Sequence, residues 1–280
     1  MAAGVSPPAA RAARAPAATA SQWSLAVRAL RSWLTNYRRT WRGTIYSSVL
    51  NPLLYLGAMG LGLGTLVNAH GQAQLGGVSY LEFLAPGLLA AGAMQTAVGE
   101  STYPIMGSIK WLKTYQAAVA SPLRPADLFH GHLLFTTLRL IMNSVIFLAA
   151  MAAFGAVRSH SAWVLAIVPV AVLTGLAFAA PIEAWAVTRT KDQSFALIFR
   201  FGMIPLFLFS GTFFPISQLP GWIRPVAYAT PLWHGVSLCR ALSLGTANLG
   251  GALVDVAYLA AVAAAGIAVG RRTYRRRLYV

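Results

Sequence analysis

Four charged residues stand inside long apolar stretches of the sequence, namely Glu100, Arg139, Glu183 and Arg200. A charged side chain at the centre of a bilayer costs at least about 2.5–3.5 kcal/mol, so such residues pair with one another or line a water-filled path. We expect Glu100 to pair with Arg139 and Glu183 to pair with Arg200. These pairs would either hold helices together or line the inner mouth of a translocation path. The two carboxylates are also the groups that a proton-coupled transporter would use.

The histidines are the other residues whose spacing invites a chemical interpretation. His130 and His132 are two positions apart, which places their rings on different sides of a helix. No cluster of cysteines and carboxylates completes a metal site around them, so we expect no bound metal. His234 is expected to cap a helix or to form a hydrogen bond within its own proline-rich stretch. An enzyme acting on lipid through His130 or His234 would need an acid, a base and an acceptor in one cluster, and the sequence offers none.

The composition places these residues in an integral membrane protein. Of the 280 residues, 57% are hydrophobic and only 10% are charged, whereas soluble domains carry roughly 25% charged residues. So apolar a chain cannot stay solvated as a disordered polymer either. We therefore expect an all-α membrane protein.

Six apolar stretches reach the length of about 20 residues that a helix needs to cross a bilayer. They cover residues 45–67, 83–107, 128–154, 163–187, 195–214 and 253–269. Residues 1–20, which are rich in Ala and Pro, are expected to form a disordered cytoplasmic tail before a transmembrane domain over residues 21–280. Within that domain, residues 23–42 predict an amphipathic helix at the membrane surface. Its apolar stripe would consist of Trp23, Val27, Leu30, Leu34, Tyr37 and Trp41.

The basic residues indicate how the chain is oriented in the membrane. They concentrate before the first span, after the second and fourth spans, and in the C-terminal tail. Between spans, the opposite side carries only Arg158, Arg224 and Arg240. Because basic residues stay in the cytoplasm, both termini are predicted to be cytoplasmic. This distribution accounts for the 22 Lys and Arg against 6 Asp and Glu without a nucleic-acid partner.

Two connections between the spans are too long to be simple turns. The cytoplasmic connection predicts a short helix at about residues 111–121, ended by Ser121 and Pro122. The outer connection, residues 215–240, is apolar, but its prolines exclude one continuous helix. These are Pro215, Pro220, Pro225 and Pro231. We expect a re-entrant helical hairpin, which is tolerated at membrane depth only where protein covers the broken backbone.

Several short motifs carry a resemblance to a known family. They are Leu84–Gly87, Lys113–Gln116 with Ser121–Leu123, Ser210–Pro215, Gln218–Pro220, and Pro231–His234 followed by Arg240. Together they resemble the permease subunits of ABC-2-type exporters, especially the branch of nodulation-factor (lipo-oligosaccharide) and daunorubicin-type drug exporters. The resemblance extends over about residues 25–270. In the outer hairpin it rests on Pro215, Pro220, Pro231, His234 and Arg240.

The resemblance implies a complex of several protein chains in the bacterial inner membrane. Such permeases form homodimers, or heterodimers with a related permease, and bind two copies of a separate ATPase that holds Mg-ATP. Residues 111–121 would be the coupling helix that sits in a groove of the ATPase. Its contact residues would be Lys113, Thr114, Tyr115, Gln116, Ala117, Ala120 and Ser121. Gln116 departs from relatives that often carry Glu there, which puts an ion pair to the ATPase in doubt.

The absence of a nucleotide-binding motif agrees with ATP binding by a separate ATPase chain. The sequence contains no G-x-x-x-x-G-K-[ST] loop, so we expect no cofactor in this chain and no enzymatic activity of its own. The favoured function is export of a hydrophobic or amphiphilic substrate, which would be a drug, a glycolipid or a lipid-linked saccharide. Phe199 and Phe207 in the fifth span would form a wall of the path, or else contact lipid. The alternative is a proton-coupled secondary transporter that uses Glu100 and Glu183, although the sequence shows no inverted repeat.

Overall fold

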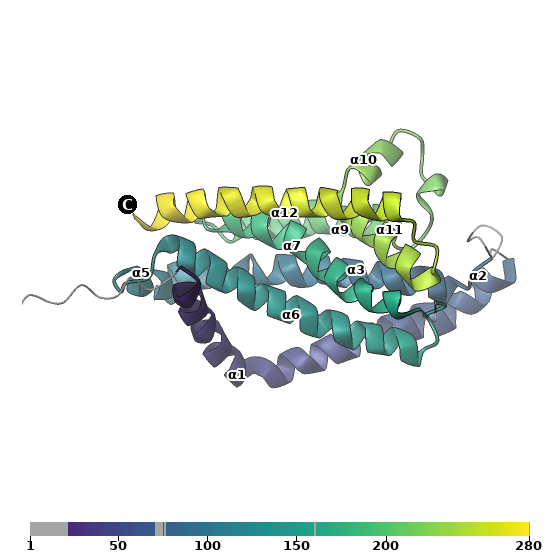
Figure 1. The fold of residues 1–280 in the computed structure, drawn as a ribbon, viewed down its shortest axis with the longest axis horizontal. Coiled ribbons are helices and arrows are strands. Elements are labelled where there is room, and N and C mark those ends of the chain that lie inside the picture. The colour runs from purple at the N-terminus through teal and green to yellow at the C-terminus, as the bar shows by residue number, and fades with distance from the viewer. Residues whose placement is uncertain (1–21, 71–74, 76, 160, 280) are drawn as a thin grey trace, which may run out of the picture.

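The computed structural model describes residues 22–70, 75, 77–159 and 161–279, and these residues are helical wherever they form regular structure. The all-α prediction is therefore confirmed for this part of the chain. The predicted N-terminal tail, residues 1–20, lies outside the described residues. Long helices run roughly along one direction and form an elongated bundle (Figure 1).

The first half of the bundle contains three long segments. Its α-helices are α1 (Gln22–Tyr55), α2 (Gly64–His70), α3 (Tyr80–Glu100), α4 (Tyr103–Met106), α5 (Thr114–Val119) and α6 (Pro125–Ala153). Two π-helical stretches, Leu56–Leu63 and Gly107–Trp111, join α1 to α2 and extend α4. Ser79 begins α3 with a capping box, because its hydroxyl accepts from the Glu82 amide while the Glu82 carboxylate accepts from the Ser79 amide.

The second half adds three further long segments and the outer connection. Its α-helices are α7 (Ile167–Ala186), α8 (Gln193–Leu197), α9 (Ile204–Phe209), α10 (Arg224–Tyr228), α11 (Pro231–Leu244) and α12 (Leu249–Leu278). Short 3₁₀ turns lie at Ala162–Ala166 and Ile216–Gln218, and a π-helical stretch, Ile198–Met203, joins α8 to α9.

Four helical segments of the described chain are long and apolar enough to cross a membrane. They are Tyr80–Trp111, Pro125–Ala153, Ala162–Ala186 and Leu249–Leu278. Two shorter apolar helices, Pro52–Val67 and Gln193–Phe209, lie where the first and fifth spans were predicted.

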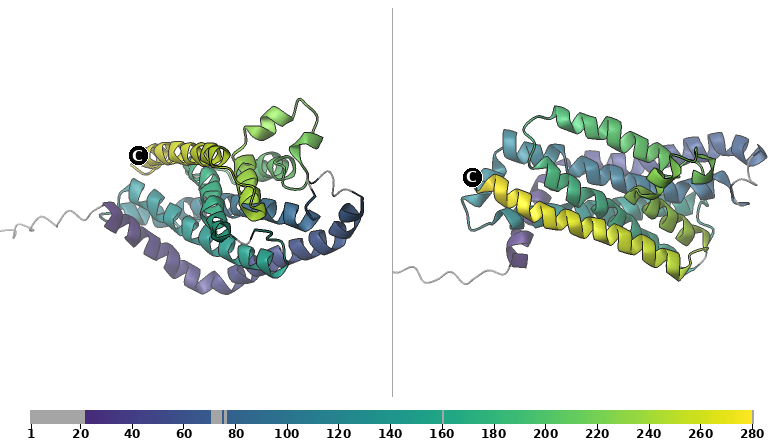
Figure 2. Two further views of the ribbon diagram at one scale, coloured as in Figure 1. Left: turned by 45° about the vertical axis from the view of Figure 1, so that its right-hand side comes forward. Right: turned by 90° about the horizontal axis from the view of Figure 1, so that it is seen from above.

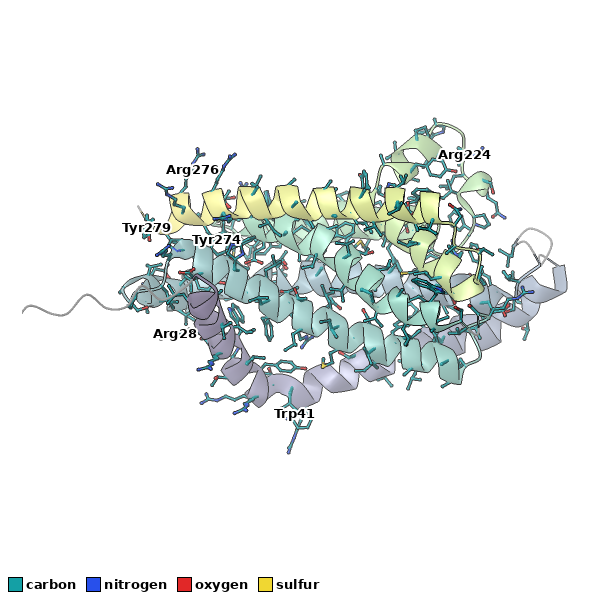
Figure 3. The ribbon with its side chains drawn as sticks, in the orientation of Figure 1. Arg28, Trp41, Arg224, Tyr274, Arg276 and Tyr279 are labelled. Carbon is teal, nitrogen blue, oxygen red and sulfur yellow. The ribbon has the colours of Figure 1, made fainter. Side chains whose placement is uncertain are left out.

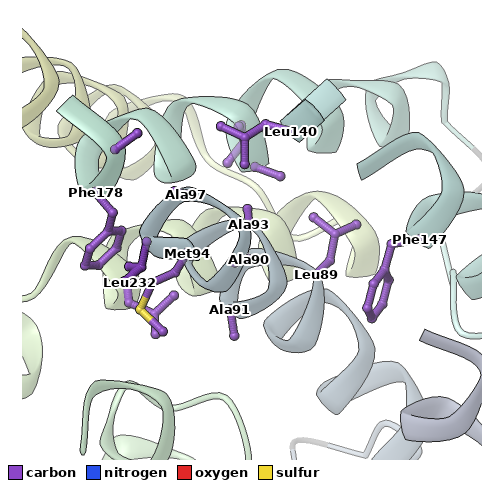
Figure 4. Packing of buried hydrophobic residues seen from close by; sticks show 14 of the residues in the cluster. Leu89, Ala90, Ala91, Ala93, Met94, Ala97, Leu140, Phe147, Phe178 and Leu232 are labelled. Carbon is purple, nitrogen blue, oxygen red and sulfur yellow. The ribbon is translucent and has the colours of Figure 1, made fainter. Parts of the chain in front are cut away.

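Helix α3 forms the centre of the bundle. It packs against α6, α7 and α11, while α12 runs along α7 and α1 runs along α6 (Figure 2). Leu89 and Ala93 of α3 lie near Leu140 and Phe147 of α6, and Met94 lies near Leu232 of α11 (Figure 4). The most buried helix is therefore the one that carries Glu100.

The N-terminal segment differs from its prediction. The expected surface helix and the first part of the first span are one α-helix, α1, which bends close to Trp41 (Figure 3). Val27 and Trp41 of the predicted apolar stripe are 39% and 43% exposed, so these two side chains do not pack into the bundle. The buried face instead uses Ala26 and Ala29, which lie against Gly131 of α6. Small residues allow the two helices to approach closely, and hydrophobicity alone could not reveal this choice of face.

The two connections largely follow their predicted breaks. The helix predicted at about residues 111–121 is shorter than expected, because Lys113 has a left-handed backbone with φ of 51° and α5 begins only at Thr114. In the outer connection, the chain breaks at its prolines, and Pro231 is the first residue of α11. Helix α11 packs on α3 and α7, whereas α10 protrudes beside the bundle (Figure 1).

The close contact of α12 with α7 gives a testable consequence. A Cβ atom on Gly266 would lie 2.6 Å from the Pro181 backbone nitrogen, so Gly266→Val must push the helices apart. We expect the unfolding free energy in mixed detergent micelles to fall by about 1–3 kcal/mol. The control is Ala268→Val on the exposed face of the same helix, which should change little. Equal stability of both variants would contradict this packing.

Candidate functional site

A fully buried carboxylate, Glu183 of α7, lies at the centre of a polar cluster near the α5 end of the bundle. Its Oε1 atom accepts a hydrogen bond of 2.8 Å from the Tyr274 hydroxyl of α12. Its Oε2 atom lies 3.0 Å from His132 Nδ1 of α6, at ion-pair distance but without hydrogen-bond orientation. The Trp33 ring of α1 lies 4.4 Å from the imidazole ring. The predicted pairing of Glu183 with Arg200 is therefore wrong.

Tyr115 connects this cluster to α5. It is only 3% exposed, and its ring lies 6.0 Å from the Tyr274 ring. Burial raises the pKa of Tyr115 well above its ordinary value, and the negative charge of Glu183 raises that pKa further. The hydroxyl therefore stays neutral, and α5 is held to the bundle by an uncharged aromatic side chain.

The other predicted coupling residues lie on the outside. Those that are exposed are Lys113, Thr114, Gln116, Ala117, Ala120 and Ser121. Gln116 Nε2 donates a 2.8 Å hydrogen bond to the Ile109 carbonyl, and Thr114 Oγ1 donates to the Ser108 carbonyl at 3.3 Å. These bonds satisfy carbonyls at the end of the π-helical stretch and hold α5 against it. Helix α5 thus combines one buried anchor with an open face.

The predicted pairing of Glu100 with Arg139 is confirmed. Arg139 Nη2 lies 3.2 Å from Glu100 Oε1, which joins α6 to α3. The guanidinium also lies 5.0 Å from the centre of the Tyr37 ring of α1, within range of a cation–π interaction. One turn further along α6, Asn143 Nδ2 donates a 3.0 Å hydrogen bond to Thr96 Oγ1 of α3.

A cavity of about 280 Å³ lies beside this pair, between α1, α3 and α6. Glu100, Arg139 and Asn143 line one part of it, and apolar side chains that include Phe147 and Phe207 line another. Of the two phenylalanines predicted to form a wall, Phe207 therefore faces this cavity.

Phe199 and Arg200 lie elsewhere. They share a shallow surface groove with Tyr103, whose ring is 6.2 Å from that of Phe199. Arg200 is exposed, and no ion pair to it is found among the described residues. The site residues predicted for a path thus separate into a cavity between α1, α3 and α6 and a groove on the surface.

Arg240 gathers three of the sequence motifs at the other end of the bundle. Its Nε atom donates to the Phe83 carbonyl at 3.0 Å and its Nη2 atom donates to the Gly211 carbonyl at 2.8 Å. Its guanidinium lies 3.7 Å from the centre of the Phe83 ring. A Cβ atom on Gly87 would lie 3.2 Å from the Thr212 carbonyl oxygen, so only glycine fits this approach without displacement. Arg240 therefore satisfies the Gly211 carbonyl, where the helical pattern ends, as irregular backbone within a membrane requires.

His234 bonds to a residue that the sequence analysis did not single out. Its Nδ1 atom lies 2.7 Å from Asp255 Oδ1 of α12, and its ring stacks 4.0 Å from the Tyr258 ring. The expected hydrogen bond exists, but its partner lies outside the proline-rich stretch. An available signal was that Asp255 is the one carboxylate in the last apolar stretch. Nothing comparable pointed to Tyr274 as the partner of Glu183.

Among the residues that the structure describes, no three or more His, Cys, Asp or Glu side chains are grouped in a way that could hold a metal ion.

Comparisons with known proteins match most of the chain. A family model described as "ABC-2 type transporter" matches residues 24–244. Nodulation protein J of Rhizobium leguminosarum bv. trifolii is 30% identical over 223 residues, which cover 76% of this chain and 82% of that protein. Nodulation protein J of Rhizobium meliloti (strain 1021) is 28% identical over 237 residues, covering 80% of this chain and 87% of that protein.

The Glu183 cluster predicts an energetic coupling between helices. Tyr274→Phe removes only the hydroxyl that donates to the carboxylate, and we expect a loss of about 1.5–3 kcal/mol in the free energy of unfolding. In a Glu183→Gln background the same change should cost less, because the charged acceptor is gone. Tyr279→Phe, at an exposed position beyond α12, is the control. An equal effect of Tyr274→Phe in both backgrounds would refute this coupling.

Proposed function

The chain belongs to the ABC-2 type transporter family and is a multi-pass permease of the cell membrane, and from this premise we propose that it is the export subunit of an ATP-driven transporter. ATP would be bound and hydrolysed, with Mg²⁺, by two copies of a separate ATPase on the cytoplasmic side. The substrate would be an amphiphile taken from the cytoplasm or the inner leaflet of a bacterial inner membrane.

The observation that carries this proposal is the attachment of α5. Its exposed face is open to a partner, while Tyr115 reaches inward to Tyr274 and the Glu183 cluster. A displacement of α5 would therefore reach α12 and α7 through packed side chains. The ATPase can shift the permease between conformations only if its ATP-bound and ATP-free forms bind α5 with different affinity.

Apolar residues next to α5 support a docking surface for such a partner. Trp111 and Leu112 are 57% and 71% exposed at the end of the preceding π-helical stretch. Large apolar side chains exposed together are typical of interaction sites. The exposed Lys113 adds a positive charge that an acidic groove would bind.

The groove around Arg200 supports pairing with a second permease, either a copy of this chain or a related one. Phe201 and Ile204 beside it are 71% and 50% exposed. A charged residue within an apolar helix does not face lipid, because its desolvation is unfavourable there. We propose that this face borders the dimer interface and the translocation path.

The similarity to nodulation protein J favours a glycolipid or lipid-linked saccharide as substrate over a drug. Proton-coupled transport is the second candidate, because carboxylates lie inside the spans. Against it, Glu100 forms an ion pair with Arg139, and Glu183 accepts a hydrogen bond from Tyr274. Export that proceeds without ATP would favour this second candidate.

The docking of α5 can be tested by co-purification. The permease co-expressed with its cognate ATP-binding subunit should retain that subunit and stimulate its ATP hydrolysis. Ala117→Asp places an uncompensated charge on the docking face and should reduce the retained ATPase at least about tenfold. Ala247→Asp, exposed in the connection between α11 and α12, should change nothing. A purified permease that hydrolyses ATP alone would overturn the proposal.

The proposed orientation, with both termini and α5 in the cytoplasm, has its own test. In a Cys239→Ala background, Ala120→Cys and Ala247→Cys each place one exposed thiol at opposite ends of the bundle. A membrane-impermeant maleimide added to spheroplasts should label the thiol at position 247 at once. It should label the thiol at position 120 only after permeabilisation. The reverse pattern would show the opposite orientation.

A further inference from the structure

The part of α1 that precedes its bend, together with the bend itself, carries five exposed arginines and no acidic residue. The arginines are Arg28, Arg31, Arg38, Arg39 and Arg42. The sequence contains no Asp or Glu before Glu82, so neither α1 nor the chain that precedes it supplies a counter-charge. None of the ion pairs found among the described residues involves these arginines. This surface is therefore positively charged without an acidic partner in the described chain.

The five arginines form a stripe on one side of the helix. At 3.6 residues per turn, their positions fall within an arc of about 100°. Arg28 and Arg31 are three positions apart, and Arg38 and Arg42 are four apart, so like charges are neighbours along the helix. Such neighbours are destabilising, whereas a solvated helix face commonly alternates positive and negative charges. A bound anion would relieve the repulsion within this arginine stripe.

The residues on either side of the arginine stripe follow the order of the layers at a membrane surface. On one side lie the apolar Val27 and Trp41, which are 39% and 43% exposed. On the other side lie Ser32 and Asn36, which are exposed and uncharged. Around the helix, the exposed side chains thus change from apolar to basic to neutral polar. This order matches hydrocarbon, phosphate and water at the surface of a bilayer.

The course of α1 supports the same placement. Before the bend, α1 slants across the direction of the long helices, with Arg28 near its start and Trp41 at the bend (Figure 3). After the bend, the chain continues to the apolar helix Pro52–Val67, where the first span was predicted. A segment that crosses the direction of the spans would lie along the membrane surface. From Arg28 to Arg42 the stripe is about 21 Å long at 1.5 Å per residue, which is enough for more than one lipid headgroup.

The opposite face of the same helix is held by α6. The Trp33 ring lies 4.4 Å from the His132 ring, and the Tyr37 ring lies 5.8 Å from the Phe135 ring. These contacts fix the rotation of α1 about its axis, so the arginine stripe points outward before any ligand binds. A surface that is ordered in advance loses less conformational entropy when it binds.

The chemistry of the stripe selects an anionic lipid. A guanidinium group binds a phosphate through two parallel hydrogen bonds. Clusters of about four to eight basic residues on an amphipathic helix are typical of binding to anionic lipids. Phosphatidylcholine carries a cation of its own, which the arginines would repel. The exposed apolar side chains of Val27 and Trp41 favour a lipid over free phosphate, because only a lipid supplies acyl chains beside its phosphate.

The other arginine group of the chain is arranged differently. It lies at the end of α12 and consists of Arg271, Arg272, Arg275, Arg276 and Arg277, which are all exposed. At 3.6 residues per turn, these positions spread over an arc of about 240°, on all sides except that of the buried Tyr274. They cannot all face one surface at the same time. This group therefore serves as a control with the same charge.

We propose that the arginine stripe of α1 binds anionic phospholipid, with guanidinium groups on the lipid phosphates and with Val27 and Trp41 among the acyl chains. The proposal goes beyond the export function and does not depend on it, because neither an ATPase nor a transported substrate takes part. The competing occupants are water with free ions, or an acidic surface of another protein.

The test measures which lipid gathers beside the stripe. The full chain carries Cys239→Ala and Val27→Cys, is labelled with bimane, and is placed in nanodiscs of phosphatidylcholine and phosphatidylglycerol. A doxyl quencher is attached to the acyl chain of one lipid or of the other. Quenching by the phosphatidylglycerol form should be at least about threefold stronger. A label on Ala264→Cys, exposed on α12, should show no preference. Equal quenching by both lipids at position 27 would overturn the proposal in favour of water and ions.

Neutralising the stripe should remove the preference. The neutralised variant combines Arg28→Gln, Arg31→Gln and Arg38→Gln, and we expect its preference to fall to that of the label on α12. The same three positions changed to Lys keep the charge and should keep most of the preference. This second variant shows that the label still reports on a folded helix. A preference that survives in the neutralised variant would overturn the proposal.

Two further outcomes exclude the remaining explanations. Arg272→Gln, Arg275→Gln and Arg276→Gln together remove the same charge from α12 and should leave the preference unchanged. Equal losses in both neutralised variants would reduce the effect to the net charge of the protein and would overturn the proposal. If neutralising the stripe releases a co-purified ATPase and leaves the lipid preference intact, the stripe binds protein and the proposal fails.

Discussion

The structure depends on one constraint: polar groups inside an apolar solvent must find their partners within the protein. The partnerships of Glu183, Glu100 and Arg240 each cross between elements that are distant in the sequence. Glu183 brings α7 together with α6 and α12, and Glu100 joins α3 to α6. Arg240 joins α11 to the start of α3 and to the turn after α9. These contacts select which helices are neighbours, whereas apolar packing alone discriminates poorly, since lipid is as apolar as leucine.

The same constraint distinguishes the packed cluster around Glu183 from the cavity beside Arg139. The side chains around Glu183 are buried and closely packed, and they reach α5 through Tyr115. This packing suits the transmission of a displacement, because packed interiors move as units rather than deform continuously. The region beside Arg139 differs, because a cavity of about 280 Å³ remains there between the helices.

A sequence prediction succeeded where the feature depends on residues that are close together in the sequence. Helix breaks at the outer prolines were predictable, because a proline removes a backbone donor wherever it stands. The pair of Glu100 and Arg139 was predictable because these opposite charges lie inside consecutive apolar stretches, where each needs a partner. The pairing of Glu183 failed for the converse reason. Its spatial neighbours, His132 and Tyr274, come from spans whose rotation about their axes no pattern in the sequence reveals.

The sequence by itself determined that this is an all-helical membrane protein with long apolar segments, and its short motifs indicated the family. Composition and periodicity suffice for this, because they report on the solvent around each segment. Only the tertiary structure decided which face of α1 is buried, that Tyr115 is an anchor while its neighbours are exposed, and that Arg240 unites three separate motifs. Contacts between helices depend on close approach at small residues and on the rotation of each helix. Neither quantity is encoded locally along the chain.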